Sequence, residues 1–210
     1  MRVLIAGATG LVGAQVLRRL LADPRCSGVV APTRRPLAPT DAKLLNPVLD
    51  FATLPADAPW YQVDAAVCAL GSTMKQAGSR EAFQQIDHGY PLQIAQAVRR
   101  QGCEVFALNS AMGAKARSPF FYNRVKGQLE EDLRALGFSS LALVRPGLIG
   151  GERAESRAGE HAAAVVLGAL APMLPKAWRI NPAERIADAL VEAALNTQPG
   201  VRVIGSAQLV

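Results

Sequence analysis

The stretch that decides the fold is Met1-Arg-Val-Leu-Ile-Ala-Gly-Ala-Thr-Gly-Leu-Val-Gly13. Arg2–Ala6 is a short apolar run that ends at a glycine, which predicts a buried strand followed by a turn. Gly7, Gly10 and Gly13 recur every three residues, and the apolar residues after them repeat at helical spacing. The stretch therefore predicts a strand, a glycine turn and a helix in direct succession.

Each glycine has its own physical role in this unit. Gly7 lets the chain turn sharply, Gly10 removes the side chain that would block a pyrophosphate, and Gly13 lets the helix pack close to the strand. The free N–H groups at the helix start and the positive end of its dipole favour a phosphate group. The alternative is a tight turn with no ligand. Because the turn directly follows an apolar strand, we expect a dinucleotide site.

The spacing G-x-x-G-x-x-G resembles that of the short-chain dehydrogenase/reductase superfamily, whose extended and atypical members open with a similar Gly-Ala-Thr-Gly turn. A second segment, residues 68–83 followed by 86–90, is similar to the atypical branch that contains Tat-interacting-protein-like and NAD-dependent epimerase/dehydratase-like proteins. The resemblance spans about residues 1–150. It implies an NAD(P)-binding Rossmann domain.

The rest of the chain alternates apolar runs with stretches of helical periodicity. Strands are expected at residues 28–31, 43–51, 63–70, 104–108, 139–144 and 201–204. Helices are expected at residues 14–21, 91–100 and 182–195. We expect Asn181 to cap the last helix. This alternation predicts an α/β fold with a Rossmann-type doubly wound parallel sheet, whose ligands bind beyond the carboxyl ends of the strands.

Length and composition agree with one domain. A chain of 210 residues, 50% of them hydrophobic, can form one sheet covered by helices on both faces. We expect a single NAD(P)-binding domain over residues 1–210, with residues 151–210 contributing a small substrate-side cap. Within the cap, residues 150–159 are expected to form a mobile loop or lid. Residues 162–174 are expected to form an apolar wall, a subunit contact or a plain core helix.

Charge and cysteine usage limit the partners. The net charge of +6 indicates a solvated basic surface first and a polyphosphate ligand next. Nucleic acid is not expected, because only 5% of residues are aromatic and no Lys/Arg block occurs. Cys26, Cys68 and Cys103 lack metal-ligand spacing, so we expect reduced thiols in a cytoplasmic protein and no metal site. We expect no signal peptide, because the apolar start belongs to the glycine-turn strand and no processing site follows it. We expect no membrane partner, because the nearly apolar residues 162–174 are too few to span a bilayer.

The end of the second expected strand bears on which dinucleotide is bound. It reads Thr33-Arg34-Arg35-Pro36, whereas NAD sites place an acidic residue there to accept a hydrogen bond from the adenosine ribose. Two arginines favour the 2′-phosphate of NADP(H). The resemblance implies that Asp50 and Phe51 lie against the adenine; the alternative is a turn after an edge strand. The expected cofactor-binding residues are Gly7, Thr9, Gly10, Leu11, Val12, Gly13, Arg34, Arg35, Asp50, Phe51, Ala69, Leu70, Gly71, Tyr122, Lys126 and Pro146.

Three residues are candidates for chemistry. Tyr122 and Lys126 are four apart and emerge from one face of a helix, and Ser110 follows an expected strand. Reduction of a carbonyl needs a proton donor and a hydrogen bond to the carbonyl oxygen. Tyr122 can donate the proton, Lys126 can stabilise the phenolate and Ser110 can orient the carbonyl. The alternative is that the tyrosine ring packs and the lysine extends into solvent. The resemblance implies that the three residues match the Ser-Tyr-Lys triad of the superfamily.

Two polar neighbours, Asp87 and His88, have open roles. Many members of the resembling family place Asn where Asp87 stands, so any support that this Asn gives an active site is in question here. His88 is expected to be a surface histidine on a helix rather than a catalytic group.

These observations predict an NADP-dependent oxidoreductase of the atypical short-chain type, which transfers hydride between nicotinamide and a small carbonyl or alcohol substrate. One alternative is a non-catalytic NADP(H)-sensing regulatory protein that binds a protein partner. Another is a DNA-binding regulator, which has only the positive charge in its favour. The substrate, the reaction direction and the choice between a monomer and a homodimer are left open.

Overall fold

The computed structural model describes residues 1–38, 40–150 and 175–210. Its main sheet has seven strands in the order β3-β2-β1-β4-β5-β6-β9, and every neighbouring pair is parallel. The strands are β1 (Arg2–Ala6), β2 (Gly28–Val30), β3 (Leu44–Leu45), β4 (Ala65–Cys68), β5 (Val105–Asn109), β6 (Ser140–Arg145) and β9 (Gly200–Gly205). The Rossmann-type α/β fold expected from the sequence is confirmed.

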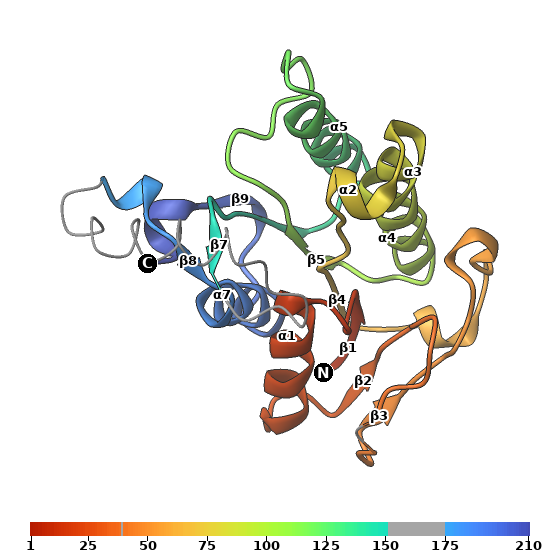
Figure 1. Cartoon of the computed structure of the whole chain (residues 1–210). Helices are drawn as coiled ribbons and strands as arrows, with labels where there is room; N and C mark the ends of the chain where they lie inside the picture. Colours follow the sequence, from red (N-terminus) through yellow and green to blue (C-terminus); the bar gives the residue numbers. More distant parts are fainter. Residues whose placement is uncertain (39, 151–174) are drawn as a thin grey trace.

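Helices cover both faces of this sheet (Figure 1). The α-helices are α1 (Leu11–Ala22), α2 (Met74–Ala77), α3 (Arg80–Gln84), α4 (Tyr90–Arg100), α5 (Phe121–Ala135) and α7 (Ala183–Leu195). Helices α1 and α7 pack on one face, and α4 and α5 pack on the other. A π-helical turn, Gln85–Gly89, joins α3 to α4.

The central strand β1 shows why the sequence forms two cores. Successive side chains of a strand point to opposite faces, so Val3 and Ile5 join the core beneath α1 and α7. Leu4 and Ala6 join the core beneath α4 and α5. All four side chains are buried. A parallel strand that is covered on both faces therefore appears in the sequence as an unbroken apolar run.

Two local expectations differ from the structure. The strand expected at residues 43–51 is reduced to β3, because Pro47 lacks the N–H that a ladder needs; only one further bridge, between Thr33 and Val48, follows it. The expectation that Asn181 caps the last helix is wrong. Helix α7 begins after Pro182 and has no side-chain cap. The Asn181 side chain instead accepts the N–H of Gly147 and donates to the carbonyl of Ser206.

The described C-terminal residues belong to the main sheet and its helix layer. Strand β9 pairs with β6, and α7 packs against α1. A small second sheet pairs β7 (Ile149–Gly150) with β8 (Asn181–Pro182). The lid expected at residues 150–159 and the apolar segment expected at residues 162–174 lie outside the described residues, apart from Gly150. The cap therefore stays a prediction.

Candidate functional site

The glycine turn between β1 and α1 has the close contacts that its sequence predicts. Gly7 has a φ of +89°, and a Cβ there would lie 2.7 Å from the backbone of Ala69. A Cβ on Gly13 would lie 1.9 Å from the carbonyl oxygen of Gly7. Only glycine fits at these two positions, because the helix start is packed directly against the turn.

Gly10 differs from the other two glycines. A Cβ on Gly10 would meet only the carbonyl oxygen of Gly7, at 3.4 Å, so the space around it is open. Gly10 also caps α1 without a side-chain hydrogen bond, and the first turn of the helix carries no acidic residue. The N–H groups at this helix start are therefore left for a ligand, as a phosphate site requires.

A cavity of about 400 Å³ lies at the carboxyl ends of β1, β2 and β4. Eight of the expected cofactor-binding residues line it: Gly7, Thr9, Gly10, Arg34, Phe51, Ala69, Leu70 and Gly71. The other expected residues do not line it: Leu11, Val12, Gly13, Arg35, Asp50, Tyr122, Lys126 and Pro146. Val12 and Gly13 are buried against the core instead.

Sequence reasoning missed seven of the residues that line this cavity. They are Ala8, Pro32, Thr33, Ser72, Gln76, Ile86 and Tyr90. Tyr90 begins α4, and its ring centroid lies 5.9 Å from that of Phe51, so two aromatic rings meet at one wall. Ser72 and Gln76 come from the segment that carries the family resemblance, and Tyr90 is its last residue. That segment was therefore the signal available in the sequence.

Arg34 is exposed and lines the cavity, and among the described residues its side chain has no ion pair or hydrogen bond. The turn that carries it is fixed by Asn46. The Asn46 amide donates to the carbonyl of Ala31 and to the hydroxyl of Thr33, at 2.6 and 2.8 Å. The same hydroxyl donates to the carbonyl of Arg35. Asn46 thus holds the strand end from which a free guanidinium extends.

Tyr122 and Lys126 lie one turn apart on α5, as the four-residue spacing predicts. Tyr122 is 40% exposed, and its ring contacts Phe83 at a centroid distance of 5.7 Å. Lys126 is only 3% exposed, and its Nζ lies 2.8 Å from Oδ1 of Asp87. Of the alternative given above, the packed tyrosine ring is present, but a lysine that extends into solvent is excluded by this burial.

The ion pair of Lys126 and Asp87 lies directly behind the cavity wall. A Cβ added to Gly71, which lines the cavity, would be 3.3 Å from Oδ1 of Asp87 and 3.6 Å from Nζ of Lys126. Only the main chain of Gly71 therefore lies between the cavity and the charged pair at this point. A larger residue at that position would push into the pair.

The structure places Ser110 in a different network from Tyr122 and Lys126. The Ser110 side chain is buried, and its hydroxyl donates to Oε1 of Glu130 at 2.5 Å. Glu130 is also buried and forms an ion pair with Arg145. Ser110 does not line the cavity. In this arrangement the proton of the hydroxyl is directed to Glu130, so only the oxygen lone pairs remain for another partner.

His88 lies away from this arrangement. Its Nε2 is 2.6 Å from Oδ2 of Asp132 on α5, and its side chain is 20% exposed. The neighbouring Asp87 points into the protein while His88 faces the α4–α5 surface. This is the surface position that the sequence predicts for His88.

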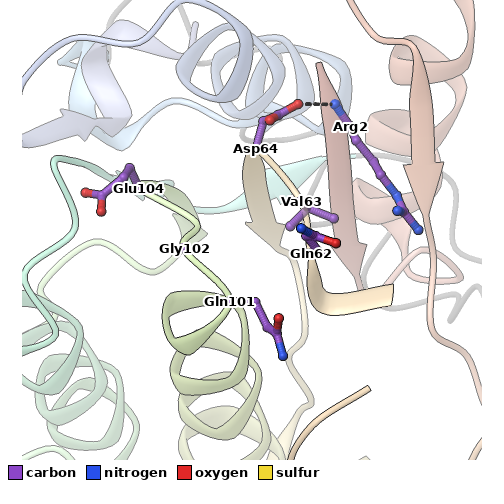
Figure 2. A pocket seen from close by; sticks show the side chains of 7 residues that line it. All are labelled: Arg2, Gln62, Val63, Asp64, Gln101, Gly102 and Glu104. Atoms are coloured by element: carbon purple, nitrogen blue, oxygen red, sulfur yellow. Dashed lines mark hydrogen bonds between the residues drawn. The ribbon is translucent and has the colours of Figure 1, made fainter. Parts of the chain in front are cut away.

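A second hollow, of about 500 Å³, opens at the opposite, amino-terminal ends of the strands (Figure 2). Oδ2 of Asp64 accepts the N–H of Arg2 there at 2.6 Å, and Glu104 pairs with Arg99. Both carboxylates therefore already have partners. Ligands of parallel sheets bind at the other ends of the strands, so we assign the site to the cavity beside the glycine turn.

Comparison with known proteins agrees with this geometry. The sequence model of the NAD dependent epimerase/dehydratase family matches residues 3–130. The chain belongs to this family. The resemblance to short-chain dehydrogenase/reductase proteins of the epimerase/dehydratase branch is thereby confirmed, and with it an enzyme family of the NAD-dependent, extended short-chain kind.

Two similar proteins of known sequence come from fungi. The chain is 35% identical to "Protein fmp52, mitochondrial" of Emericella nidulans over 97% of this chain and 91% of that protein. It is 36% identical to "Protein FMP52, mitochondrial" of Candida albicans over 80% of this chain and 76% of that protein. The cytoplasmic location expected from the sequence is wrong, because these relatives are named mitochondrial. Reduced cysteines do not distinguish one reducing compartment from another.

Two solved structures with the same fold are complexes with NAD. MoeE5 in complex with UDP-glucuronic acid and NAD has a TM-score of 0.73 and 16% identity, with 98% of this chain and 76% of that chain covered. Bordetella bronchiseptica WbmH in complex with NAD+ has a TM-score of 0.69 and 16% identity, with 98% and 75% covered. At this identity the likeness establishes the fold alone.

Among the described helices, none is long and apolar enough to cross a membrane.

Proposed function

We propose that the protein is an NADP(H)-dependent oxidoreductase that interconverts a small carbonyl compound and the matching alcohol. The observation that carries the proposal is that one cavity is lined by the open glycine turn and by Arg34, and is backed by the buried Lys126. We further propose that residues 1–210 act as one NAD(P)-binding domain, in which α7 and β9 belong to the helix layer and the main sheet.

The residues present fit a dinucleotide. The space at Gly10 and the uncapped start of α1 suit a pyrophosphate, and Arg34 is free to meet a 2′-phosphate. Phe51 and Tyr90 offer apolar ring surface at the same cavity. When bound, the nicotinamide supplies or accepts the hydride. Gly71 would let the cofactor approach the wall in front of Lys126 without a side chain between them.

In this proposal Tyr122 is the proton donor. Its ring is half-exposed at the start of α5, so its hydroxyl can reach a substrate oxygen. Lys126, one turn further on, is buried and cationic, and its field stabilises the phenolate that remains after proton transfer. Ser110 can take part as a hydrogen-bond acceptor, or as a donor once its side chain has rotated away from Glu130.

The choice of NADP(H) over NAD(H) follows from charge. The strand end that meets the adenosine ribose carries Arg34 and Arg35 and no carboxylate. A guanidinium offers paired donors and opposite charge to a 2′-phosphate, and neither to a 2′-hydroxyl. The test is calorimetric titration of the protein with NADPH and with NADH. We expect clearly tighter binding of NADPH; equal affinities would overturn the preference, and binding of neither would overturn the proposed function.

A further inference from the structure

Asp87 is the most buried carboxylate among the residues that the structure describes, with 1% of its surface exposed. It lies in the π-helical turn Gln85–Gly89, between α3 and α4. Such single π turns are rare within helices and are found frequently at functional sites. The turn places Asp87 beneath the cavity wall, while its neighbour His88 contacts α5 at the surface.

The two oxygens of Asp87 contact two different segments. Oδ1 lies 2.8 Å from Nζ of Lys126 on α5. Oδ2 accepts the backbone N–H of Ser72 at 2.8 Å, in the loop that follows β4 and lines the cavity. One carboxylate thus links the π turn, the helix that carries the proposed proton donor, and the cavity loop.

The charge of Lys126 depends on this contact. Burial on its own would lower the pKa of Lys126, but the Asp87 carboxylate, together with Tyr122 and Cys68, raises it above the ordinary value. Cys68 on β4 contributes no negative charge near neutral pH, because burial raises the pKa of its thiol to about 11. Tyr122 on α5 is a neutral phenol when it serves as a proton donor. Of the three groups that raise the pKa of Lys126, Asp87 is therefore the one that offers it a carboxylate.

We propose that Asp87 is a positioning residue that clamps the Lys126 ammonium and the Ser72 main chain in one arrangement behind the cavity. This inference rests on the proposed role of Lys126. A neutral amide at this position could make similar hydrogen bonds, but it would not compensate a cation taken out of water. The carboxylate keeps Lys126 charged and immobile before any ligand binds. The site is then already formed when a substrate arrives.

The experiment follows the ionisation of Lys126 by NMR in protein labelled with [13Cε]lysine. The chain has five lysines, so the Lys126 signal is assigned by its loss in Lys126→Met. In the wild type we expect this signal to titrate above the ordinary lysine value of 10.5. In Asp87→Asn we expect it to titrate below that value, because the buried ammonium has lost its counter-charge.

Glu130→Gln is the matched control. Glu130 is as deeply buried, lies one turn beyond Lys126 on α5 and pairs with Arg145, so its loss should leave the Lys126 titration unchanged. An unchanged midpoint in Asp87→Asn, or an equal fall in Glu130→Gln, would overturn the proposal. Should Asp87→Asn fail to fold, a wild-type midpoint below 10.5 would overturn it and one above would support it.

The titration uses the protein without cofactor, so its outcome is separate from that of the proposed function. A protein that binds neither NADPH nor NADH would refute the oxidoreductase while the Asp87 clamp could still be measured. An unchanged Lys126 midpoint in Asp87→Asn would refute the clamp and would leave the proposed cofactor binding untouched.

Discussion

The hydroxyl of Ser110 donates a hydrogen bond to Glu130 at 2.5 Å, and both side chains are buried. This relationship connects the end of β5 with α5 and, through the ion pair of Glu130 and Arg145, with the end of β6. Ser110 therefore has a structural partner in the protein, whatever it does toward a ligand.

Ser110→Ala should destabilise the fold. A hydrogen bond to a charged group contributes about 1.5–3 kcal/mol, and the variant also leaves one lone pair of Glu130 unsatisfied. We expect the free energy of unfolding in urea to fall by about that amount, with NADPH affinity unchanged. Ser72→Ala is the control, because within the described part of the chain its hydroxyl hydrogen-bonds only to the neighbouring Thr73 carbonyl. Equal stability of the two variants would argue against the structural role of Ser110.

Gly10→Ala and Gly13→Ala should impair different properties, the first NADPH binding and the second the stability of the fold. A methyl group on Gly10 meets only one atom, at 3.4 Å, so the variant should fold normally and lose NADPH affinity at least about tenfold by obstructing the pyrophosphate. A methyl group on Gly13 would lie 1.9 Å from the Gly7 carbonyl, so that variant should lose stability first. Calorimetry and thermal melting of both variants test this. Unchanged affinity in a folded Gly10→Ala protein would contradict the phosphate assignment.

Arg34→Ala should reduce the preference for NADPH over NADH. One charge-assisted contact is worth about 1.5–3 kcal/mol, which corresponds to roughly ten- to a hundredfold in affinity. Arg35→Ala is the control, because Arg35 is exposed but does not line the cavity. The ratio of the two dissociation constants, measured for each variant, is the readout. If the preference for NADPH survives in Arg34→Ala and is lost in Arg35→Ala, then Arg35 and not Arg34 binds the 2′-phosphate.

Stability should fall in alkaline solution through the buried thiols. Burial raises the pKa of Cys68, and of Cys103, to about 11 from an ordinary value of 9.0. Between these values the folded state holds thiol protons that the unfolded state has released, so folding loses free energy as pH rises. Between the two pKa values each thiol contributes a slope of at most about 1.4 kcal/mol per pH unit, and this slope fades as the pH falls below 9. Urea unfolding from pH 8 to pH 10.5 should show a smaller slope in Cys68→Ala; identical slopes would contradict the prediction.

The fold was predictable because the local sequence motifs and the alternation of strands and helices along the chain indicate the same parallel sheet. The apolar run before Gly7 and the three glycines specify β1, the turn and α1 without tertiary information. β3 was predicted too long, since Pro47 stops the ladder that the apolar pattern favours. Asn181 was misassigned because a helix cap and a loop anchor both use the same amide, and only the three-dimensional contact with Gly147 and Ser206 separates them.

The site was predictable where a motif fixes the backbone, and not where side chains meet across elements. The glycine turn follows β1 and Arg34 follows β2, and both line the cavity as expected from the sequence. The pairing of Asp87 with Lys126, and of Ser110 with Glu130, joins residues 39 and 20 positions apart. No local pattern records such contacts. They arise where the π turn packs against α5 and where the residue after β5 meets the same helix.

The measurement that tests the account most directly is transfer of deuterium from 4-deuterated NADPH to a panel of small aldehydes and ketones, followed by mass spectrometry of the alcohols. With wild-type protein we expect deuterium at the former carbonyl carbon. With Tyr122→Phe we expect the rate to fall at least about a hundredfold, at unchanged NADPH affinity. Tight NADPH binding without any transfer would contradict an oxidoreductase and favour a protein that only senses the cofactor. Equal rates in wild type and Tyr122→Phe would contradict the role of Tyr122.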